Sequence, residues 1–327
     1  MKAVVAQQLG PSAHYNLLET DVPEPGPGQV QIKVQVAGMG YVDGLVSRGL
    51  YQVKPPVPYC PGLELAGTVS KLGAGVTTFA LGERVSASAF GGGLAQFAVV
   101  DVAAVQSVPE NLDIRAAAGF LINYITAWHG LLDRGALQPG ETVLVLGAAG
   151  GVGVAAVQVA RLAGARVIAG ASSAAKREFA LTHGAHEVLD YSQADWRAEL
   201  KQRTGGRGVD VVFDPVGGRL LEPAFRSLAW RGRHLVVGFA GGDIPALPVN
   251  LALLKGSALI GVDYRQFGSV YEASASAAIR EQLFAAVQRG DLAPPLGATF
   301  AFADYRAAMD LAASRDGVGK TVVRIAE

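Results

Sequence analysis

The stretch from Val143 to Gly153, VLVLGAAGGVG, is the feature that most limits how this chain can fold. Its apolar start is typical of a strand buried on both faces, and its glycines pass directly into a helical segment that ends near Ala163. Further apolar runs follow at 166–169, 187–189, 209–213 and 234–238. Helical segments lie between these runs: one ends at His183, and the others lie near 196–203 and 221–228. Regular alternation of this kind predicts a parallel, doubly wound α/β sheet.

The first 120 residues follow a different pattern, with short alternating strands broken by glycine and proline, as in the apolar positions 30, 32, 34 and 36. This pattern predicts a small, mainly antiparallel β domain. Beyond about Tyr264 there are two helical segments, near 276–289 and 305–313, and a final strand near 321–325. That tail is too short for a domain of its own. We therefore predict two domains, residues 1–122 with 265–327, and residues 123–264.

Composition narrows the classes of partner. The 28 basic and 28 acidic side chains cancel, which argues against nucleic acid or a membrane surface as the main partner. A single cysteine, Cys60, rules out an intrachain disulfide and is expected to be a small packed side chain in a reducing, cytoplasmic protein. No apolar run approaches the roughly 20 residues needed to span a bilayer. A small molecule is the expected partner.

The glycine-rich turn has the geometry that holds a pyrophosphate. Gly150 and Gly151 allow the backbone to approach a ligand closely, and the helix that follows offers unpaired N–H groups with a partial positive charge. The spacing departs from the usual G-x-G-x-x-G, because Ala148 occupies the first position and Gly147 precedes it. We expect a dinucleotide at this turn.

The residues after the next strand indicate which dinucleotide it is. A carboxylate there would hold the ribose hydroxyl of NAD, but the sequence instead supplies Ser172, Ser173, Lys176 and Arg177. Hydroxyl donors and cations suit a 2′-phosphate, which favours NADPH over NADH. The alternative is that a serine only caps the following helix and that the two cations are solvated.

Five motifs in this order resemble the zinc-free quinone oxidoreductase, or zeta-crystallin-like, branch of the medium-chain dehydrogenase/reductases. They are PYCPGLELAGTV, LGERV, LQPGETVLVLGAAGGVG, GVDVVFDPVGG and GKTVVRI, and they span nearly the whole chain. The resemblance implies a GroES-like β-rich catalytic domain and a Rossmann domain that binds NADPH. It also implies a homodimer, with the strand 258–262 as the candidate edge at which two sheets join.

The resemblance also implies which residues contact the cofactor. Gly151 and Val152 would lie at the pyrophosphate, and Ser172, Ser173, Lys176 and Tyr191 at the adenosine phosphate. The remaining implied contacts are Thr126 near the nicotinamide, Gly238, Phe239, Ala240 and Val262 along the cofactor, and the more distant Arg315.

The positions of zinc ligands in related alcohol dehydrogenases are filled by other residues here. Gly40 stands where those enzymes have a cysteine, and Leu63, next to Glu64, stands where they have a histidine. We therefore expect no metal, and a zinc-dependent alcohol dehydrogenase is disfavoured.

Without zinc, the negative charge that builds on the acceptor oxygen must be met by other donors. The candidates are Tyr41 and Tyr51, with Asn123 and Tyr124 as further polar groups near the expected nicotinamide site. Asp43 fits a structural hydrogen-bonding role better than acid catalysis.

Two family side chains are missing, because Gly40 replaces an asparagine and Leu45 replaces a tyrosine. The expected function is an NADPH-dependent oxidoreductase that transfers hydride to a quinone or an α,β-unsaturated carbonyl compound. The alternatives are an enoyl-thioester reductase and a non-catalytic NADPH-binding protein of the crystallin type.

Overall fold

The computed structural model describes residues 1–326, which form two compact units. One unit contains residues 1–122 and 294–327, and the other contains residues 123–293. The boundary expected after Tyr264 differs from this division, because residues 265–293 group with the parallel sheet.

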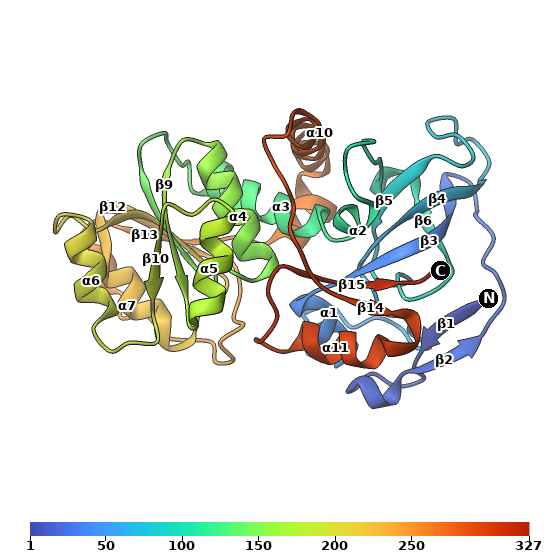
Figure 1. Ribbon diagram of the computed structural model, residues 1–327, viewed down its shortest axis with the longest axis horizontal. Coiled ribbons are helices and arrows are strands. Elements are labelled where there is room, and N and C mark those ends of the chain that lie inside the picture. The colour runs from blue at the N-terminus through green and yellow to red at the C-terminus, as the bar shows by residue number, and fades with distance from the viewer. Residues whose placement is uncertain (327) are drawn as a thin grey trace. The chain divides into compact units, whose positions relative to one another are not determined.

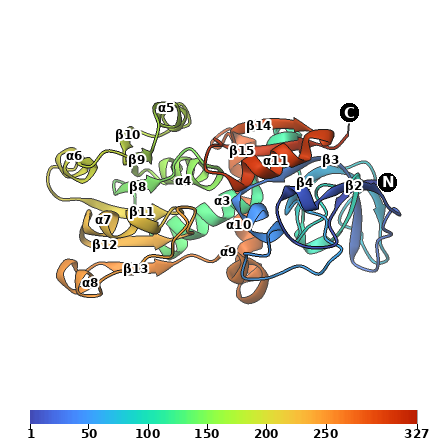
Figure 2. The same ribbon diagram turned by 90° about the horizontal axis from the view of Figure 1, so that it is seen from below.

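The second unit is built on a six-stranded sheet in which every neighbouring pair is parallel. Its order is β10-β9-β8-β11-β12-β13, which Figure 2 shows from one edge to the other. The prediction of a parallel, doubly wound sheet is confirmed, and the reversal of order lies at β8. The strands are β8 (Thr142–Leu146), β9 (Arg166–Ala171), β10 (Glu187–Asp190), β11 (Val209–Asp214), β12 (Leu228–Val236) and β13 (Ala258–Gly261).

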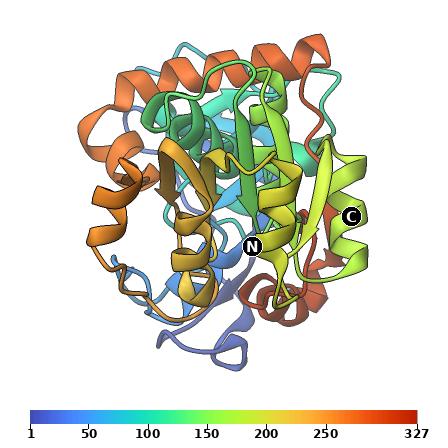
Figure 3. The same cartoon turned by 90° about the vertical axis from the view of Figure 1, so that its left-hand side faces the viewer.

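Helices cover both faces of this sheet, with α4 on one face and α6, α7 and α8 on the other (Figure 2). Figure 3 views the same unit from another side, with α5 near one edge of the sheet and α8 near the other. The helices are α4 (Gly151–Leu162), α5 (Ala174–Thr182), α6 (Trp196–Arg203), η4 (Gly218–Leu220), α7 (Leu221–Arg226) and α8 (Asn250–Lys255). The sheet strands supply much of a core that includes Leu144, Ile168 and Val212.

Specific contacts explain why residues 265–293 join this unit. The ring of Phe267 stacks on His129, with 3.8 Å between ring centroids. The Gln158 amide donates to the carbonyl of Ala293 at 2.9 Å and accepts its N–H at 3.2 Å. The helices concerned are α3 (Leu121–Trp128), η3 (His129–Arg134), α9 (Tyr264–Gln266), η5 (Phe267–Tyr271) and α10 (Ala273–Arg289).

The first unit is built on a mainly antiparallel sheet in the order β14-β15-β3-β4-β5-β7, with β6 paired to β3. Only β14 and β15 run parallel among its paired strands within residues 1–326. The predicted β-rich domain is confirmed. Its strands are β1 (Lys2–Val5), β2 (Asn16–Glu19), β3 (Gln29–Met39), β4 (Glu64–Leu72), β5 (Arg84–Ser88), β6 (Phe97–Asp101), β7 (Val105–Ser107), β14 (Leu296–Ala301) and β15 (Lys320–Arg324).

Two helices pack side by side against this sheet, α1 (Tyr41–Ser47) and α11 (Tyr305–Ala313) (Figure 1). A Cβ on Gly44 would lie 2.6 Å from the Ala313 methyl carbon, so this close approach requires glycine. The remaining helices of the unit are η1 (Ser12–His14), η2 (Val102–Ala104), α2 (Ile114–Ala117) and η6 (Phe302–Asp304). No helix within residues 1–326 has the length and apolarity needed to cross a bilayer.

Candidate functional site

The glycine-rich turn joins β8 to the start of α4. Gly147 has φ +59°, in the left-handed region that glycine tolerates. The first hydrogen bond of the helix runs from Val154 N–H to Gly150 C=O at 2.9 Å. The N–H groups of Gly151, Val152 and Gly153 therefore have no acceptor within the helix, and together with the helix dipole they form an anion cradle.

Two glycines of this turn are required by close contacts. A Cβ on Gly153 would lie 2.1 Å from the Gly147 carbonyl oxygen, which no side chain allows. A Cβ on Gly151 would lie 2.8 Å from Nδ2 of Asn123. The structure thus brings Asn123 to the phosphate-binding turn, which its position 28 residues earlier did not indicate.

The expected adenosine-phosphate residues meet at the carboxyl ends of β9 and β10. These strands are parallel neighbours, with Ala171 opposite Asp190. Ser172 follows the first strand and is exposed, and Tyr191 follows the second. Because carboxyl ends of parallel strands share one edge, the two side chains lie at the same end of the sheet.

Ser173 and Arg177 both have structural partners in this region. The Ser173 hydroxyl accepts the N–H of Lys176 at 3.4 Å and so caps α5. Arg177 pairs with Asp190 at 2.8 Å and also donates to the Ala171 carbonyl at 3.3 Å. The expectation of two cations for a phosphate is therefore corrected, because Arg177 is held by Asp190. Sequence reasoning missed this pair, since its partner comes one strand later.

The loop after β11 is shaped by a buried pair that sequence reasoning also missed. One carboxyl oxygen of Asp214 accepts the N–H groups of Val216 and Gly217, both at 2.8 Å, and the other lies 3.0 Å from His234 Nε2. Both side chains are fully buried. The adjoining loop is held to it, since the Ala240 N–H donates to the Pro215 carbonyl at 3.1 Å. Hydrogen bonds therefore hold together the loop after β11 and the loop after β12, which carries the implied cofactor contacts Gly238, Phe239 and Ala240.

Three other implied positions are buried in the same unit. The Tyr124 hydroxyl donates to Gln158 at 2.8 Å, and burial raises its pKa. This contact corrects the expectation that Tyr124 is a donor to the acceptor oxygen, because its hydroxyl already donates to Gln158 inside the unit. Thr126 is 8% exposed and Val262 is 7% exposed, with the Val262 N–H donating to Val236.

In the β-rich unit, the loop after β3 is fixed by Asp43. Its carboxylate accepts the N–H of Gly40 and the N–H of Leu63, each at 2.8 Å. The side chain is 3% exposed, and burial raises its pKa to about 6 against the opposing effect of the nearby Lys320 charge. Asp43 thus joins the two positions where zinc-containing relatives have metal ligands.

Next to Leu63, Glu64 forms a second buried connection. One oxygen accepts the N–H of Ile122 at 2.9 Å, and the other lies 2.5 Å from the ammonium of Lys320. Glu64 is 1% exposed and Lys320 is 7% exposed. This ion pair joins β4 to β15 across 256 positions of sequence.

The two tyrosines of the loop are half-buried. Tyr41 begins α1, and the Tyr51 ring lies 6.4 Å from that of Phe90 between centroids. Arg315 is exposed in the segment between α11 and β15, and it belongs to a different unit from the phosphate-binding turn.

Metal and thiol chemistry find little support among the described side chains. Within residues 1–326, no three His, Cys, Asp or Glu side chains gather where they could hold a metal ion. Burial raises the pKa of Cys60 to about 12, so its thiol stays protonated at neutral pH and is a poor nucleophile.

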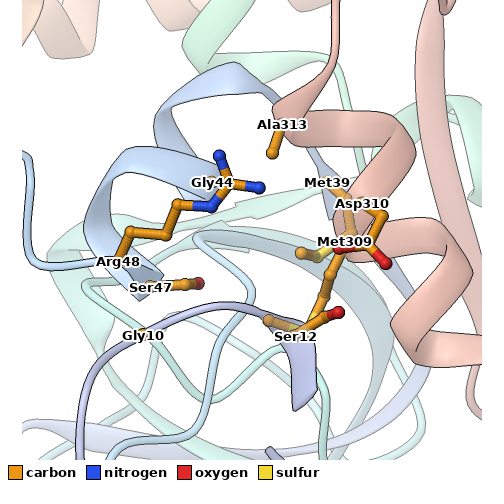
Figure 4. A pocket seen from close by; sticks show the side chains of 9 residues that line it. All are labelled: Gly10, Ser12, Met39, Gly44, Ser47, Arg48, Met309, Asp310 and Ala313. Carbon is orange, nitrogen blue, oxygen red and sulfur yellow. The ribbon is translucent and has the colours of Figure 1, made fainter. Parts of the chain in front are cut away.

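A small surface pocket lies where α1 packs on α11 (Figure 4). Its interior volume is about 10 Å³, roughly what a single water molecule needs. It is therefore too small for a quinone. The lining residues are Gly10, Ser12, Met39, Gly44, Ser47, Arg48, Met309, Asp310 and Ala313.

Comparison with known proteins supports this assignment of the two units. Residues 26–110 match the alcohol dehydrogenase GroES-like domain, and residues 151–279 match the zinc-binding dehydrogenase family. The chain is 37% identical over 309 residues to quinone oxidoreductase-like protein 2 of Rattus norvegicus, covering 93% of this chain and 87% of that protein.

Two solved structures are also similar along the whole chain. Escherichia coli quinone oxidoreductase complexed with NADPH has a TM-score of 0.90 at 25% identity, covering 99% of this chain and 100% of that one. CurK enoyl reductase has a TM-score of 0.89 at 26% identity, covering 99% and 98%. With both domains and a relative of this similarity, the chain belongs to the quinone oxidoreductase (zeta-crystallin-like) branch of the medium-chain dehydrogenase/reductase superfamily.

Proposed function

We propose that this protein is an NADPH-dependent oxidoreductase that reduces a quinone or an α,β-unsaturated carbonyl compound without a metal. The observation that carries the proposal is the turn from β8 to α4, where three N–H groups have no helical acceptor and Gly153 lets the helix pack against Gly147. Such a turn fits a pyrophosphate. Membership of the quinone oxidoreductase branch supports the choice of reaction.

The end of β9 supports NADPH as the cofactor. No carboxylate stands at Ser172 or Ser173, where one would oppose a 2′-phosphate, and Lys176 adds a cation one helical turn later. Asp190, the nearest carboxylate of the next strand, is paired with Arg177. The E. coli relative was solved with NADPH.

The remaining roles are proposals that follow from this assignment. Ser172, Ser173, Lys176 and Tyr191 hold the adenosine phosphate, and Gly151 and Val152 hold the pyrophosphate. Bound NADPH supplies the hydride. Asn123, which lies against Gly151, orients the acceptor's carbonyl group, and Tyr41 and Tyr51 contact the acceptor. The further cofactor contacts are Gly150, Thr126, Gly238, Phe239, Ala240, Val262 and Arg315.

The test is to follow NADPH oxidation with a benzoquinone and with an α,β-unsaturated ketone as separate acceptors, each in parallel with NADH. We expect turnover with at least one acceptor and a lower Kd for NADPH than for NADH. Tight NADPH binding with no turnover of any acceptor would instead support a non-catalytic protein of the crystallin type.

An enoyl-thioester reductase is the second candidate, because the chain resembles CurK enoyl reductase along its whole length. That reaction also places hydride on a carbon conjugated to a carbonyl group. Adding a short enoyl-CoA as a third acceptor distinguishes this candidate from the quinone or enone reductase. A kcat/KM for enoyl-CoA well above that for the quinone and the ketone would favour this candidate.

We further propose that the protein is a homodimer joined through β13. This strand is an edge of the six-stranded sheet, and its Leu259 side chain is 47% exposed. Other large apolar side chains of the same unit are also exposed, including Trp230 at 72% and Leu253 at 80%. Light scattering should give a dimer mass that Leu259→Lys lowers to the monomer mass, whereas Leu181→Lys, on α5, should leave the dimer intact.

A further inference from the structure

The side chain of Lys320 passes close to three glycines and ends beside Gly40, between β3 and α1. A Cβ on Gly119 would lie 2.2 Å from Lys320 Cγ, and a Cβ on Gly38 would lie 3.0 Å from its Cε. A Cβ on Gly40 would lie 3.3 Å from Nζ. Gly38 is required above all by the Ala118 carbonyl oxygen, which would lie 1.9 Å from its Cβ, whereas Gly119 makes room for the lysine stem, and the ammonium ends beside position 40.

The ammonium of Lys320 is held in place, but not all of its N–H groups donate hydrogen bonds. It is buried, and within residues 1–326 its one hydrogen-bond acceptor is Glu64, at 2.5 Å. An ammonium carries three N–H donors, so two of them make no hydrogen bond to these residues, although the Asp43 carboxyl lies near enough to interact with the charge. Gly40 is half-buried, and a Cβ there would meet only Lys320 Nζ at 3.3 Å and Asp43 Oδ2 at 3.7 Å within 4 Å, which leaves room beside the ammonium. A buried polar side chain with spare donors requires an explanation.

We propose that the Lys320 ammonium is the electrophile of this enzyme, donating a hydrogen bond to the acceptor's carbonyl oxygen in the space that Gly40 leaves open. This inference rests on the proposed function and names the group that replaces the metal. It is also consistent with Gly40, because a larger residue at that position would place its Cβ 3.3 Å from the ammonium and narrow the space beside it.

The chemistry balances without a further reagent. Hydride adds to the electrophilic carbon of the acceptor, the π electrons move to the carbonyl oxygen, and NADP⁺ remains. The oxygen then carries a negative charge that the fixed ammonium stabilises, in surroundings where a positive charge acts more strongly than in water. Water finally protonates the enolate. With a quinone, the ring carbon that received the hydride then loses a proton to water while the second carbonyl oxygen gains one, which gives the quinol. Lys320 keeps its own proton.

Removing the lysine alone would leave Glu64 buried without its partner, which destabilises a protein whatever the lysine does in catalysis. The test therefore compares Lys320→Met/Glu64→Gln with Glu64→Gln, both of which lack the buried carboxylate. We expect kcat with a quinone to fall by roughly 10²-fold or more between the two, the usual effect of losing one oxyanion donor. Lys320→Arg/Glu64→Gln should recover part of the loss.

A surface pair in the same unit gives a matched control. Lys71 and Glu24 lie 2.5 Å apart with 51% and 66% of their side chains exposed. The double change Lys71→Met/Glu24→Gln removes the same two charges and should leave kcat unaltered. NADPH Kd, measured by fluorescence, and the unfolding midpoint are recorded for every variant.

The outcomes separate the inference from the proposed function. Absence of turnover by the unaltered protein defeats the proposed function and this inference with it. Normal turnover together with equal kcat values for Lys320→Met/Glu64→Gln and Glu64→Gln overturns the inference alone. A weakened NADPH affinity with equal kcat values also overturns it, because the ammonium would then serve a cofactor phosphate.

If the double variant does not fold, Gly40→Ala answers the same question with every charge in place. Position 40 has φ −138°, which alanine adopts freely, and the added methyl group would stand 3.3 Å from Nζ, in the proposed oxygen position. We expect at least a tenfold fall in kcat/KM for the quinone at constant NADPH Kd. An unchanged kcat/KM would overturn the inference.

Discussion

The carboxylate of Asp43 accepts the N–H of Leu63, twenty positions later in the chain, at 2.8 Å. A second N–H, that of Gly40, donates to the same carboxylate. Zinc-containing relatives have ligands at positions 40 and 63, and a metal ion would connect the two segments. Here a buried side chain makes the connection, so the loop that carries Tyr41 and Tyr51 is held without a metal.

Asp43 should make stability depend on pH in an unusual direction. Its pKa is raised from 3.8 in the unfolded chain to about 6 in the folded protein, chiefly by burial. The folded state therefore binds the proton more tightly, so the stabilisation is present below about pH 4 and is lost as the pH rises through 6. The free energy of unfolding, relative to Asp43→Asn, should fall by about 3 kcal/mol across this window.

Urea unfolding of the unaltered protein and of Asp43→Asn from pH 4 to 7 measures this difference. The contributions of the other titrating groups are the same in both proteins and cancel in the difference. Asp310→Asn, at an exposed position on α11, is the control and should give a difference that does not vary with pH. A difference that grows with pH would mean that the pKa of Asp43 is lowered on folding.

Gly153→Ala should disrupt the phosphate-binding turn. Its Cβ would lie 2.1 Å from the Gly147 carbonyl oxygen, so α4 must move away from the turn, at a cost of about 1–3 kcal/mol in unfolding free energy. Gly150→Ala is the matched control, since its Cβ would lie at an ordinary 3.5 Å from the same oxygen. Equal unfolding free energies for the two variants would show that the turn adapts without strain.

Ser172→Asp should shift cofactor preference. The new carboxylate would follow β9, where it repels a 2′-phosphate and can accept a ribose hydroxyl. We expect the Kd for NADPH to rise about tenfold relative to that for NADH, a shift of about 1.4 kcal/mol. Fluorescence titration with both cofactors measures the ratio, and Ser274→Asp, at an exposed position in the same unit, is the control. A constant ratio would argue against a phosphate beside Ser172.

His234→Ala should weaken the loop after β11. The change removes the partner of a fully buried Asp214 oxygen, and breaking such a pair costs roughly 3 kcal/mol. Thermal and urea unfolding measure the loss, with His14→Ala at an exposed position as the comparison. If the unfolding free energy stays within about 0.5 kcal/mol of the original, the pair is not needed to hold the loop.

Local pattern was enough to predict most of the parallel-sheet unit. The helix Trp196–Arg203 has the expected bounds, and in the β-rich unit so does the helix Tyr305–Ala313. The prediction places the segment 265–293 in the β-rich domain, but it belongs to the parallel-sheet unit. Its helical pattern does not indicate that Phe267 stacks on His129. Strand β12 begins at Leu228, whereas the sequence pattern predicts a start near His234. The pattern misses the first part of the strand because the polar residues Arg231 and Arg233 interrupt its apolar run.

The sequence by itself determined the fold class and the phosphate-binding turn, because apolar periodicity and glycine spacing act over a few neighbouring residues. Only the tertiary structure decided that Asp43 joins positions 40 and 63, that Arg177 belongs to Asp190, and that Lys320 ends beside Gly40. These partners are far apart in sequence. A buried charge is stabilised by whatever group the folded chain brings within about 3 Å, and no local pattern specifies that group.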